Sequence, residues 1–385
     1  MSHRPIYLDN HATTPVDQRV LEAMLPYFTE YFGNPASLTH QYGWEAEAAV
    51  KQARTTLANA INAPVEEIIF TSGATEANNL AIKGVAEAYF SKGRHLITVV
   101  TEHNAVLDPC HYLQSLGFEI SYLPVQPDGL IDLKQLQQEI RPETVLISVM
   151  AANNEIGVLQ PLAAIGELCQ QHGILFHTDA AQALGKIPLD VQKMQIDLMS
   201  LTAHKIYGPK GIGALYIRRR PKRVKIAPQI HGGGHERGFR SGTLYTPQIV
   251  GFAKAVELAT SEMESESTRL RKLRERLWSQ ISSVGDIFLN GHPSERLAGN
   301  LNVSVAGVDG QALLLALQPI VAVSSGSACT STKIEPSHVL EAIGLPAPLA
   351  FASLRFGIGR LNTVSEIDHV AEAVIKTITA LRRRV

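Results

Sequence analysis

The chain has 385 residues, of which 45% are hydrophobic and 18% are charged, and its formal net charge is −1. These values are typical of a globular protein with a large core, and so balanced a charge gives no general attraction to nucleic acid or anionic membranes. Three cysteines without a CxxC pair argue against a disulfide framework, and no run approaches the roughly 18 apolar residues of a membrane helix. The first residues lack a signal or transit peptide pattern. We therefore expect a cytoplasmic protein with no nucleic-acid or membrane partner.

The N-terminal residues alternate between short periodic stretches and breakers. A short strand in YLDNHATTP ends at Pro15, an amphipathic stretch covers residues 17–30, and a loop rich in Gly and Pro follows at residues 32–40. Helical spacing returns at residues 42–62. The loop has too many breakers for a helix, so Asn34 is predicted to be presented rather than packed.

The segment IIFTSGATEANNLAIKG predicts a strand, a Gly turn and then an Ala-rich helix. The first amides of a helix are unpaired and the helix dipole is positive there, so this junction is a predicted anion site. Ala74 and Thr75 would bind a phosphate through backbone and hydroxyl groups. A capping box formed by Thr71 or Ser72 with Glu76 explains the same pattern equally well.

Strands alternate with helices through the middle of the chain. The predicted helices are residues 105–116, 133–140 and 162–172, and the predicted strands are residues 95–100, 119–123, 145–150, 173–178 and 197–201. This βαβ rhythm predicts an α/β fold with a mostly parallel sheet and helices on both of its faces.

Polar side chains follow two of these strands. His103 comes just after the first strand and Asn154 just after the third. The carboxyl ends of parallel strands meet at one rim of a sheet, where α/β proteins bind ligands. A lone histidine is more often a satisfied polar residue than a catalyst, but at this rim a flat imidazole could stack on a ring and move a proton.

An acid and an amine are predicted at the same rim, because Asp179 ends one apolar run and Lys205 follows the next. Pyridoxal phosphate needs such a pair: a lysine amine binds it as a Schiff base, and a carboxylate keeps its ring nitrogen protonated. Thr202 and His204 offer donors for its phosphate. Taken singly, Asp179 could be a helix N-cap and Lys205 a solvated lysine. An S/T-x-H-K followed by glycines, one strand after a D-x-x-Q, favours the cofactor site.

Basic residues cluster once, at residues 218–225, without interleaved aromatics, and a solvated loop is predicted there. A Gly-rich loop with Thr243 comes next and could reach the anion site of a neighbouring subunit or form a mobile lid. A long helix at residues 245–282 then leads to a small α+β domain. The chain exceeds the roughly 250 to 300 residues at which single cores stop growing. We predict a large domain of residues 16–255 and a small domain of residues 1–15 and 256–385.

The small domain carries two residues of chemical interest. Cys329 lies in VSSGSACTSTKIEP, which is too rich in Ser and Gly to pack a core. Cys329 is therefore predicted to be exposed, mobile and able to reach a ligand, whereas Cys110 and Cys169 are predicted to be buried and inert. Arg355 lies in an otherwise apolar strand, where an unpaired guanidinium is costly, so a carboxylate of the protein or of a substrate is its expected partner.

Nine segments of the chain, taken in order, resemble one family. They are LDNHATTP, FGNPAS, FTSGATEANNLAIKG, TEHNAVL, NNEIG, HTDAAQALGK, HKIYGPKGIGALY, HGGGHERGFRSGT and SSGSACTS. Together they closely resemble the cysteine desulfurases of the NifS/IscS type, over nearly the whole chain. The last segment separates this group from relatives with a shorter catalytic loop. The resemblance implies a homodimeric, fold type I pyridoxal phosphate enzyme without a metal site.

The resemblance implies a role for each cofactor ligand. Lys205 would form the Schiff base, Asp179 would contact the pyridine nitrogen, and Gln182 would contact the phenolic oxygen. The phosphate would be bound by four residues of the same chain and by one from the other subunit of the dimer: Ala74, Thr75, Thr202, His204 and, across the interface, Thr243.

The resemblance also implies the substrate site. His103 would stack on the cofactor ring and act as acid or base, and Asn154 would touch cofactor and substrate. Asn34 and Arg355 would hold the substrate carboxylate. Cys329 would be the nucleophile.

The implied activity is the removal of sulfur from L-cysteine, which leaves alanine and a persulfide on Cys329. The sulfur would supply iron–sulfur cluster or thio-cofactor synthesis. Selenocysteine or cystine lyase chemistry on the same scaffold is one alternative. A sulfur-relay protein without useful turnover is another.

The protein that accepts the sulfur is left open by the sequence. Members of the family that dock the iron–sulfur scaffold protein often have a C-terminal extension, whereas this sequence stops at residue 385. The expected acceptor is therefore the scaffold protein or another sulfur acceptor.

Overall fold

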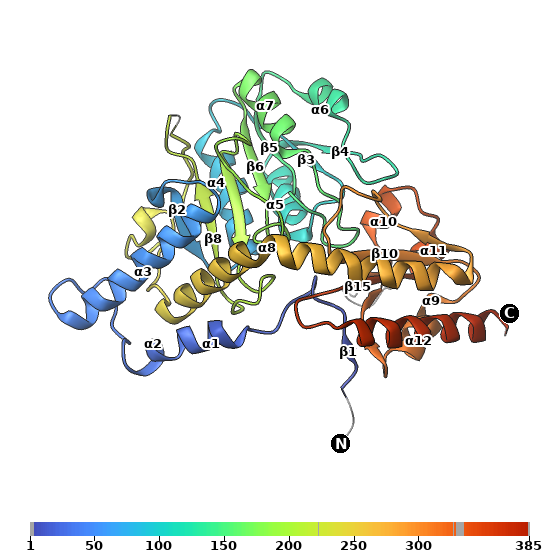
Figure 1. Ribbon diagram of the computed structural model, residues 1–385. Coiled ribbons are helices and arrows are strands. Elements are labelled where there is room, and N and C mark those ends of the chain that lie inside the picture. Colours follow the sequence, from blue (N-terminus) through green and yellow to red (C-terminus); the bar gives the residue numbers. More distant parts are fainter. Residues whose placement is uncertain (1–3, 222, 326, 329–334, 384–385) are drawn as a thin grey trace.

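The computed structural model describes residues 4–221, 223–325, 327–328 and 335–383 (Figure 1). Its largest sheet has seven strands in the order β2-β8-β7-β6-β5-β3-β4. In chain order these are β2 (Ile68–Thr71), β3 (His95–Val99), β4 (Glu119–Leu123), β5 (Thr144–Ser148), β6 (Leu175–Asp179), β7 (Leu198–Thr202) and β8 (Gly213–Ile217). Within this sheet β8 is antiparallel to its neighbours β2 and β7, and all other pairs are parallel. The prediction of a mostly parallel sheet is confirmed.

Helices cover both faces of this sheet, which is why every residue of its central strands β5, β6 and β7 is buried. Apolar side chains of α3, α6, α7 and α8 pack on one face, and those of α4 and α5 pack on the other. The bounds are α3 (Gln41–Ala60), α4 (Ala74–Ala88), α5 (Asn104–Ser115), α6 (Leu133–Glu139), α7 (Leu162–His172) and α8 (Thr246–Ile281). The amphipathic stretch at residues 17–30 forms two helices, α1 (Gln18–Met24) and α2 (Pro26–Thr29), because proline cannot continue α1.

A second sheet has the order β12-β15-β10-β9 and is antiparallel throughout. Its strands are β9 (Ile287–Leu289), β10 (Asn300–Val305), β12 (Ser324–Ser325) and β15 (Ser353–Gly357). The helices of this part are α9 (Gly310–Leu317), α10 (His338–Ala342), α11 (Ala347–Phe351) and α12 (Val364–Arg382). Two short pairs complete it: β1 (Ile6–Tyr7) with β11 (Val321–Ala322), and β13 (Ser327–Ala328) with β14 (Glu335–Pro336).

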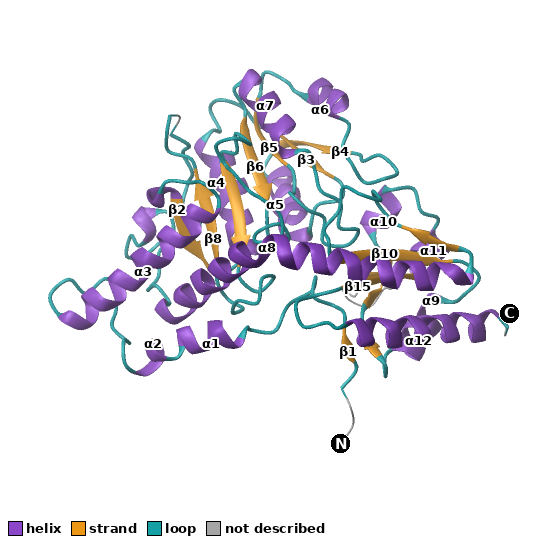
Figure 2. Cartoon of the chain, viewed as in Figure 1, coloured by secondary structure: helices purple, strands orange, loops and turns teal. Residues whose placement is uncertain are grey.

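The long helix α8 runs along both sheets (Figure 2). Its first half packs into the core of the seven-stranded sheet, and Leu273, Leu277 and Ile281 near its end pack into the core of the second sheet. The predicted boundary between residues 255 and 256 falls inside this helix. The division into a large and a small domain stays a prediction.

The prediction of a solvated basic loop at residues 218–225 is wrong for its first residue, Arg218. Arg218 is buried, donates hydrogen bonds to the carbonyl oxygens of Ile196 (3.0 Å) and Val191 (2.6 Å), and lies 3.6 Å from Asp197. These contacts tie the end of β8 to the segment before β7.

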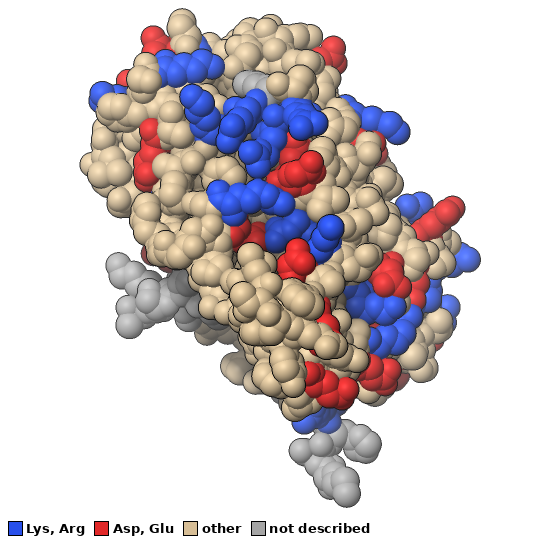
Figure 3. Space-filling model, turned by 90° about the vertical axis from the view of Figure 1, so that its left-hand side faces the viewer, with Lys and Arg blue, Asp and Glu red and all other residues tan. Residues whose placement is uncertain are grey.

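The face at the left of Figure 1 carries Lys and Arg with Asp and Glu among them (Figure 3).

Candidate active site

A cavity of about 650 Å³ opens where the parallel strands end. Its walls come from the segments that follow β3, β5, β6 and β7, from the start of α4, and from β15. Ten of the predicted residues line it: Ala74, Thr75, His103, Asn154, Asp179, Gln182, Thr202, His204, Lys205 and Arg355. The structure therefore brings together side chains that the sequence placed on separate strands and loops.

The start of α4 is open to a ligand. Its N-cap is Gly73, whose φ of 154° suits glycine, and no side chain caps the helix. A Cβ on Gly213 would lie 2.7 Å from the Gly73 backbone, so two glycines let β8 approach this turn. The alternative capping box is only half formed: Glu76 accepts the Ser72 N–H (2.8 Å) and pairs with Arg240 (2.8 Å), but no side chain of the cap accepts an N–H of the first turn. The free amides of α4 lie where a phosphate can bind.

Asp179 is buried at the end of β6, and both of its carboxylate oxygens are held. Oδ1 accepts the backbone N–H of Ala181 (2.8 Å), and Oδ2 accepts the Asn78 side-chain amide (2.7 Å). Asn78 is buried on α4, one turn after Ala74 and Thr75. The carboxylate therefore has a fixed position in the cavity.

Lys205 projects into the cavity just after β7. Its Nζ donates to the carbonyl oxygens of His11 (2.5 Å) and Ala12 (2.6 Å). Burial, followed by the positive charge of Arg355, lowers the pKa of Lys205 to about 8. A larger fraction of this amine is deprotonated near neutral pH than for an ordinary lysine, which suits a nucleophilic amine.

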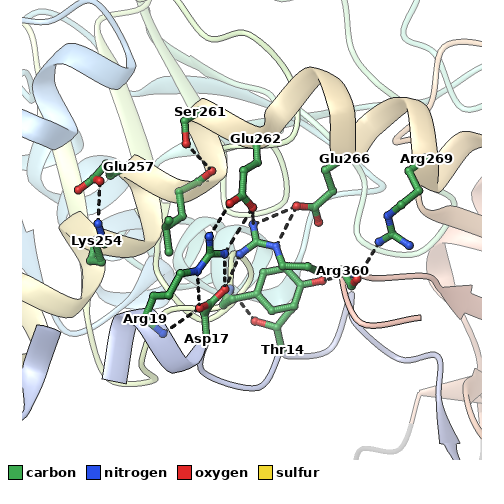
Figure 4. A network of polar contacts seen from close by, with 12 residues as sticks. Thr14, Asp17, Arg19, Lys254, Glu257, Ser261, Glu262, Glu266, Arg269 and Arg360 are labelled. Atoms are coloured by element: carbon green, nitrogen blue, oxygen red, sulfur yellow. Dashed lines mark hydrogen bonds and ion pairs between the residues drawn. The ribbon is translucent and has the colours of Figure 1, made fainter. Parts of the chain in front are cut away.

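The backbone after Lys205 is anchored to two distant segments. Tyr207 has a positive φ of 64°, its N–H donates to Thr14 Oγ1 (2.8 Å), and the Arg360 guanidinium lies 4.4 Å from its ring centroid. Arg360 also pairs with Asp17 (2.8 Å) and with Glu266 of α8 (2.9 Å), as Figure 4 shows. These contacts hold Tyr207 in a backbone conformation that is unfavourable for an aromatic residue.

His103 is the N-cap of α5. Its Nδ1 accepts the Ala105 N–H (3.0 Å), so the neutral ring carries its proton on Nε2. Burial, more than its charged neighbours, lowers the pKa of His103. A neutral imidazole on the cavity wall can exchange a proton with a bound molecule.

The prediction that Arg355 pairs with a carboxylate is confirmed, and the partner is Asp9. Its Nη2 contacts Asp9 Oδ1 (2.7 Å) and Ser324 Oγ (2.7 Å), and its Nη1 donates to the carbonyl oxygen of Asn154 (2.9 Å). Its buried Nε has no partner among the described residues, and neither does Asn154 Oδ1. Three of the five N–H groups of Arg355 are thus used to hold it in the cavity wall, and two have no partner among the described residues.

Three predicted residues are not brought to this cavity by the described chain. Asn34 is exposed and its Oδ1 accepts the Ala36 N–H (3.0 Å), and Thr243 is exposed in the Gly-rich loop. Cys329 lies outside the described residues. Cys110 and Cys169 are buried as predicted, and burial raises the pKa of the Cys110 thiol to about 12.

Sequence reasoning missed Asp9, His11 and Asn78 as parts of this site. Asp9 and His11 lie in the motif LDNHATTP, which was singled out only as part of the resemblance. Asn78 lies three residues after Thr75, so helical spacing could have placed it one turn further along α4. Its contact with Asp179 spans 101 residues of sequence and leaves no local signal.

The donor set fits pyridoxal phosphate. The cavity offers an amine of lowered pKa, a fixed carboxylate, and a helix N-terminus with open amides. These groups match the aldehyde, the ring nitrogen and the phosphate of that cofactor.

Comparisons with known proteins agree with this fit. The aminotransferase class-V family model matches residues 6–370. The cysteine desulfurase of Homo sapiens is 57% identical, covering 98% of this chain and 83% of that protein. Cysteine desulfurase IscS of Rickettsia rickettsii (strain Iowa) is 54% identical, covering 98% of this chain and 92% of that protein.

Solved structures agree as well. A NifS-like protein is 38% identical, with a TM-score of 0.91 over 98% of this chain and 100% of that one. SspA in complex with cysteine is 41% identical, with a TM-score of 0.83 over 92% of this chain and 98% of that one.

The chain therefore belongs to the aminotransferase class-V family of fold type I, pyridoxal phosphate-dependent enzymes. Within that family it groups with the cysteine desulfurases of the NifS/IscS type, as the sequence resemblance predicted.

Proposed function

We propose that the chain is a cysteine desulfurase that converts L-cysteine to L-alanine and leaves the sulfur on Cys329 as a persulfide. The observation that carries this proposal is the convergence of Lys205, Asp179 and Arg355 on one cavity. An amine, a buried carboxylate and a guanidinium with a spare donor are the groups that an amino acid and pyridoxal phosphate need. The similarity to a protein solved with cysteine supports the choice of substrate.

The proposed roles follow from the surroundings of each residue. Arg355 would bind the substrate carboxylate, with Asp9 and Ser324 keeping its guanidinium in place. Lys205 would hold the cofactor, and its lowered pKa would let it accept and release a proton near neutral pH. His103 would exchange a proton through Nε2.

Pyridoxal phosphate, when bound, supplies a ring that takes up electrons from the substrate carbon. Asp179 would stabilise the proton on the ring nitrogen through its fixed negative charge, while the amides of Ala74 and Thr75 would bind the phosphate. Gln182, Thr202 and His204 line the same cavity and would complete the set of cofactor ligands.

The sulfur transfer balances without an external oxidant. The Cys329 thiolate would attack the substrate sulfur, so that a sulfur–sulfur bond forms and the carbon–sulfur bond breaks. The electron pair of the broken bond stays on the substrate carbon, which takes up a proton and becomes the methyl group of alanine. A reductant in solution would then release the sulfur and regenerate the thiol.

The test is alanine release from L-cysteine, with a reductant present, by the wild type and by Cys329→Ala. We expect the wild type to turn over and the variant to bind cysteine, seen as a change in cofactor absorbance, without releasing alanine. Alanine release by the variant would mean that Cys329 is not the nucleophile and would favour a lyase that expels sulfur directly. Activity with selenocysteine but not with cysteine would favour a selenocysteine lyase. An inactive wild type that co-purifies with partners would favour a relay protein.

We also propose a homodimer, because an exposed aromatic surface surrounds the two residues left outside the cavity. Phe28 packs on Tyr245 (6.2 Å between ring centroids), two residues from Thr243, and Phe32 packs on Tyr42 (5.3 Å), near Asn34. Phe32 and Trp44 remain 63% and 55% exposed. A second copy on this surface would bury the rings and bring Thr243 and Asn34 near a cavity. Sedimentation of the holoenzyme tests the dimer.

The destination of the sulfur and the compartment are proposals of the same kind. We propose that an iron–sulfur scaffold or another acceptor protein takes the sulfur from Cys329 and that the reaction occurs in the cytoplasm. In the described part of the chain, no helix has both the length and the apolar character needed to span a membrane. Pull-down of partners from cell extract, followed by sulfur transfer to the purified candidate, tests the acceptor.

A further inference from the structure

Lys186 is a charged residue behind the cavity that the proposed reaction does not use. It lies four residues after Gln182, and its Nζ donates to Gln182 Oε1 (3.0 Å). Gly185 precedes it with a φ of 67°, and a Cβ there would lie 2.5 Å from Ala259 of α8. The glycine therefore lets the chain turn tightly against α8, directly before Lys186.

Lys186 is partly buried. It lines a small cavity of about 50 Å³ together with His11, Lys205 and Glu266. Burial, followed by the charge of Lys205, lowers the pKa of Lys186 to about 7, while Glu266 opposes the shift. An amine in such a place is costly, so a specific contact is expected to balance the cost.

The Gln182 amide has one favourable orientation among these neighbours. A lysine amine donates hydrogen bonds, so the oxygen of the amide faces Lys186. On its other side, Gln182 Nε2 donates to the His11 carbonyl oxygen (2.8 Å). The reverse orientation would set the amide N–H groups against the Lys186 amine and the amide oxygen against a carbonyl oxygen.

The orientation of the Gln182 amide also decides which ring nitrogen of His11 carries the proton. Its Nδ1 lies 3.1 Å from Gln182 Oε1, and an amide oxygen only accepts, so Nδ1 carries the proton. His11 Nε2 is then an unprotonated acceptor, and it has no partner among the described residues. Burial lowers the pKa of His11 well below its ordinary value, which agrees with a neutral ring.

We propose that Lys186 is a positioning residue that orients the Gln182 amide so that it offers an N–H, rather than its oxygen, to the cofactor. Gln182 lines the cavity, and the His11 carbonyl uses one of its two N–H groups. The other N–H has no acceptor among the described residues and is available to the phenolic oxygen. The inference rests on the proposed contact of Gln182 with that oxygen.

Three contacts hold the amide in this orientation: the bonds to Oε1 from Lys186 and from His11 Nδ1, and the bond from Nε2 to the His11 carbonyl. When Lys186 is protonated, its hydrogen bond is roughly twice as strong as one between neutral groups, such as the two bonds with His11. Removing Lys186 leaves only the contacts with His11, whose neutral ring can carry its proton on either nitrogen, so the amide can reverse for part of the time. Each reversal replaces a donor by an acceptor beside an oxygen that carries negative charge.

The test is a pH titration of the absorbance of the lysine-bound cofactor in the purified holoenzyme. A donated N–H stabilises the negative oxygen of the deprotonated chromophore, so losing it raises the pKa of the chromophore. We expect Gln182→Ala to raise that pKa by about 1 pH unit. Lys186→Met should raise it by at least half as much. Lys193→Met, at an exposed lysine of the same segment, should leave it unchanged.

The double variant separates positioning from a direct effect of charge. If Lys186 acts through Gln182, Lys186→Met should have no further effect in the Gln182→Ala background. A shift that persists in that background would overturn the proposal, and so would a Lys186→Met titration identical to that of the wild type. If Lys186→Met does not fold, Lys186→Gln keeps a donor without charge and should shift the pKa less than Gln182→Ala does. Alanine release by the wild type tests the proposed function independently of these titrations.

Discussion

The Gly-rich loop with Thr243 is anchored by a buried ion pair, and removing one partner should destabilise the protein strongly. Arg54 of α3 binds Glu236 through two contacts, Nη2–Oε1 (2.6 Å) and Nη1–Oε2 (2.7 Å). Glu236 Oε2 also accepts the Phe70 N–H of β2 (2.6 Å), and Arg54 donates to the Ile68 carbonyl oxygen (2.7 Å). Glu236→Ala would therefore leave a buried guanidinium without its counter-charge.

The size of the expected loss in the free energy of unfolding follows from the burial of the pair. Breaking a buried pair from one side costs about 3–5 kcal/mol, whereas exposed pairs contribute about 0–1 kcal/mol. The chain offers a matched control with the same distance of 2.6 Å: Arg141 with Glu119, whose side chains are 45% and 73% exposed. Glu119→Ala should lower the free energy of unfolding by less than about 1 kcal/mol.

Urea unfolding of both variants, at fixed protein and cofactor concentrations, measures the difference. Replacing both buried partners, Arg54→Met with Glu236→Leu, should recover much of the loss, because no unpaired charge remains. Equal costs for Glu236→Ala and Glu119→Ala would refute the reasoning, since burial would then make no difference.

Two further predictions concern the cavity, and a third concerns a buried carboxyl group outside its lining. Asp179→Asn should lower kcat/KM for L-cysteine about 100-fold, because an amide cannot hold the ring nitrogen protonated; unchanged kinetics would contradict this role. Arg355→Lys should raise KM about tenfold with a smaller change in kcat, since an ammonium cannot keep the contacts to Asp9 and Asn154 and also bind a carboxylate; a change in kcat alone would contradict it. Glu102 is fully buried, and burial raises its pKa well above 4.5, so above about pH 5 the folded state binds more protons than the unfolded state and stability falls as pH rises. Glu102→Gln should therefore be more stable than the wild type at about pH 8, and the gain should shrink near pH 4; a gain independent of pH, measured by urea unfolding, would contradict it.

The sequence predicted those cavity-lining residues that lie at or just after strand ends. Asp179, Lys205 and His103 each follow an apolar run, and the geometry of a parallel sheet alone brings such positions to one rim. The open amides at Ala74 and Thr75 were predicted for a different reason: a strand, a glycine and a helix define that junction locally.

The supporting contacts could not be predicted in this way. Asp9 reaches Arg355 across 346 residues, and Glu236 reaches Arg54 across 182, so neither pair has a local pattern. Lys186 is four residues from Gln182, but its place behind the cavity depends on how Gly185 packs on α8. Such partners follow from tertiary packing rather than from periodicity.

The most direct test of the account is the mass of the protein after one cycle with L-cysteine in the absence of reductant. We predict that the peptide containing Cys329 gains the mass of one sulfur atom and that one alanine is released per chain. Alanine release with unmodified Cys329, or with the sulfur on Cys110 or Cys169, would contradict the proposal.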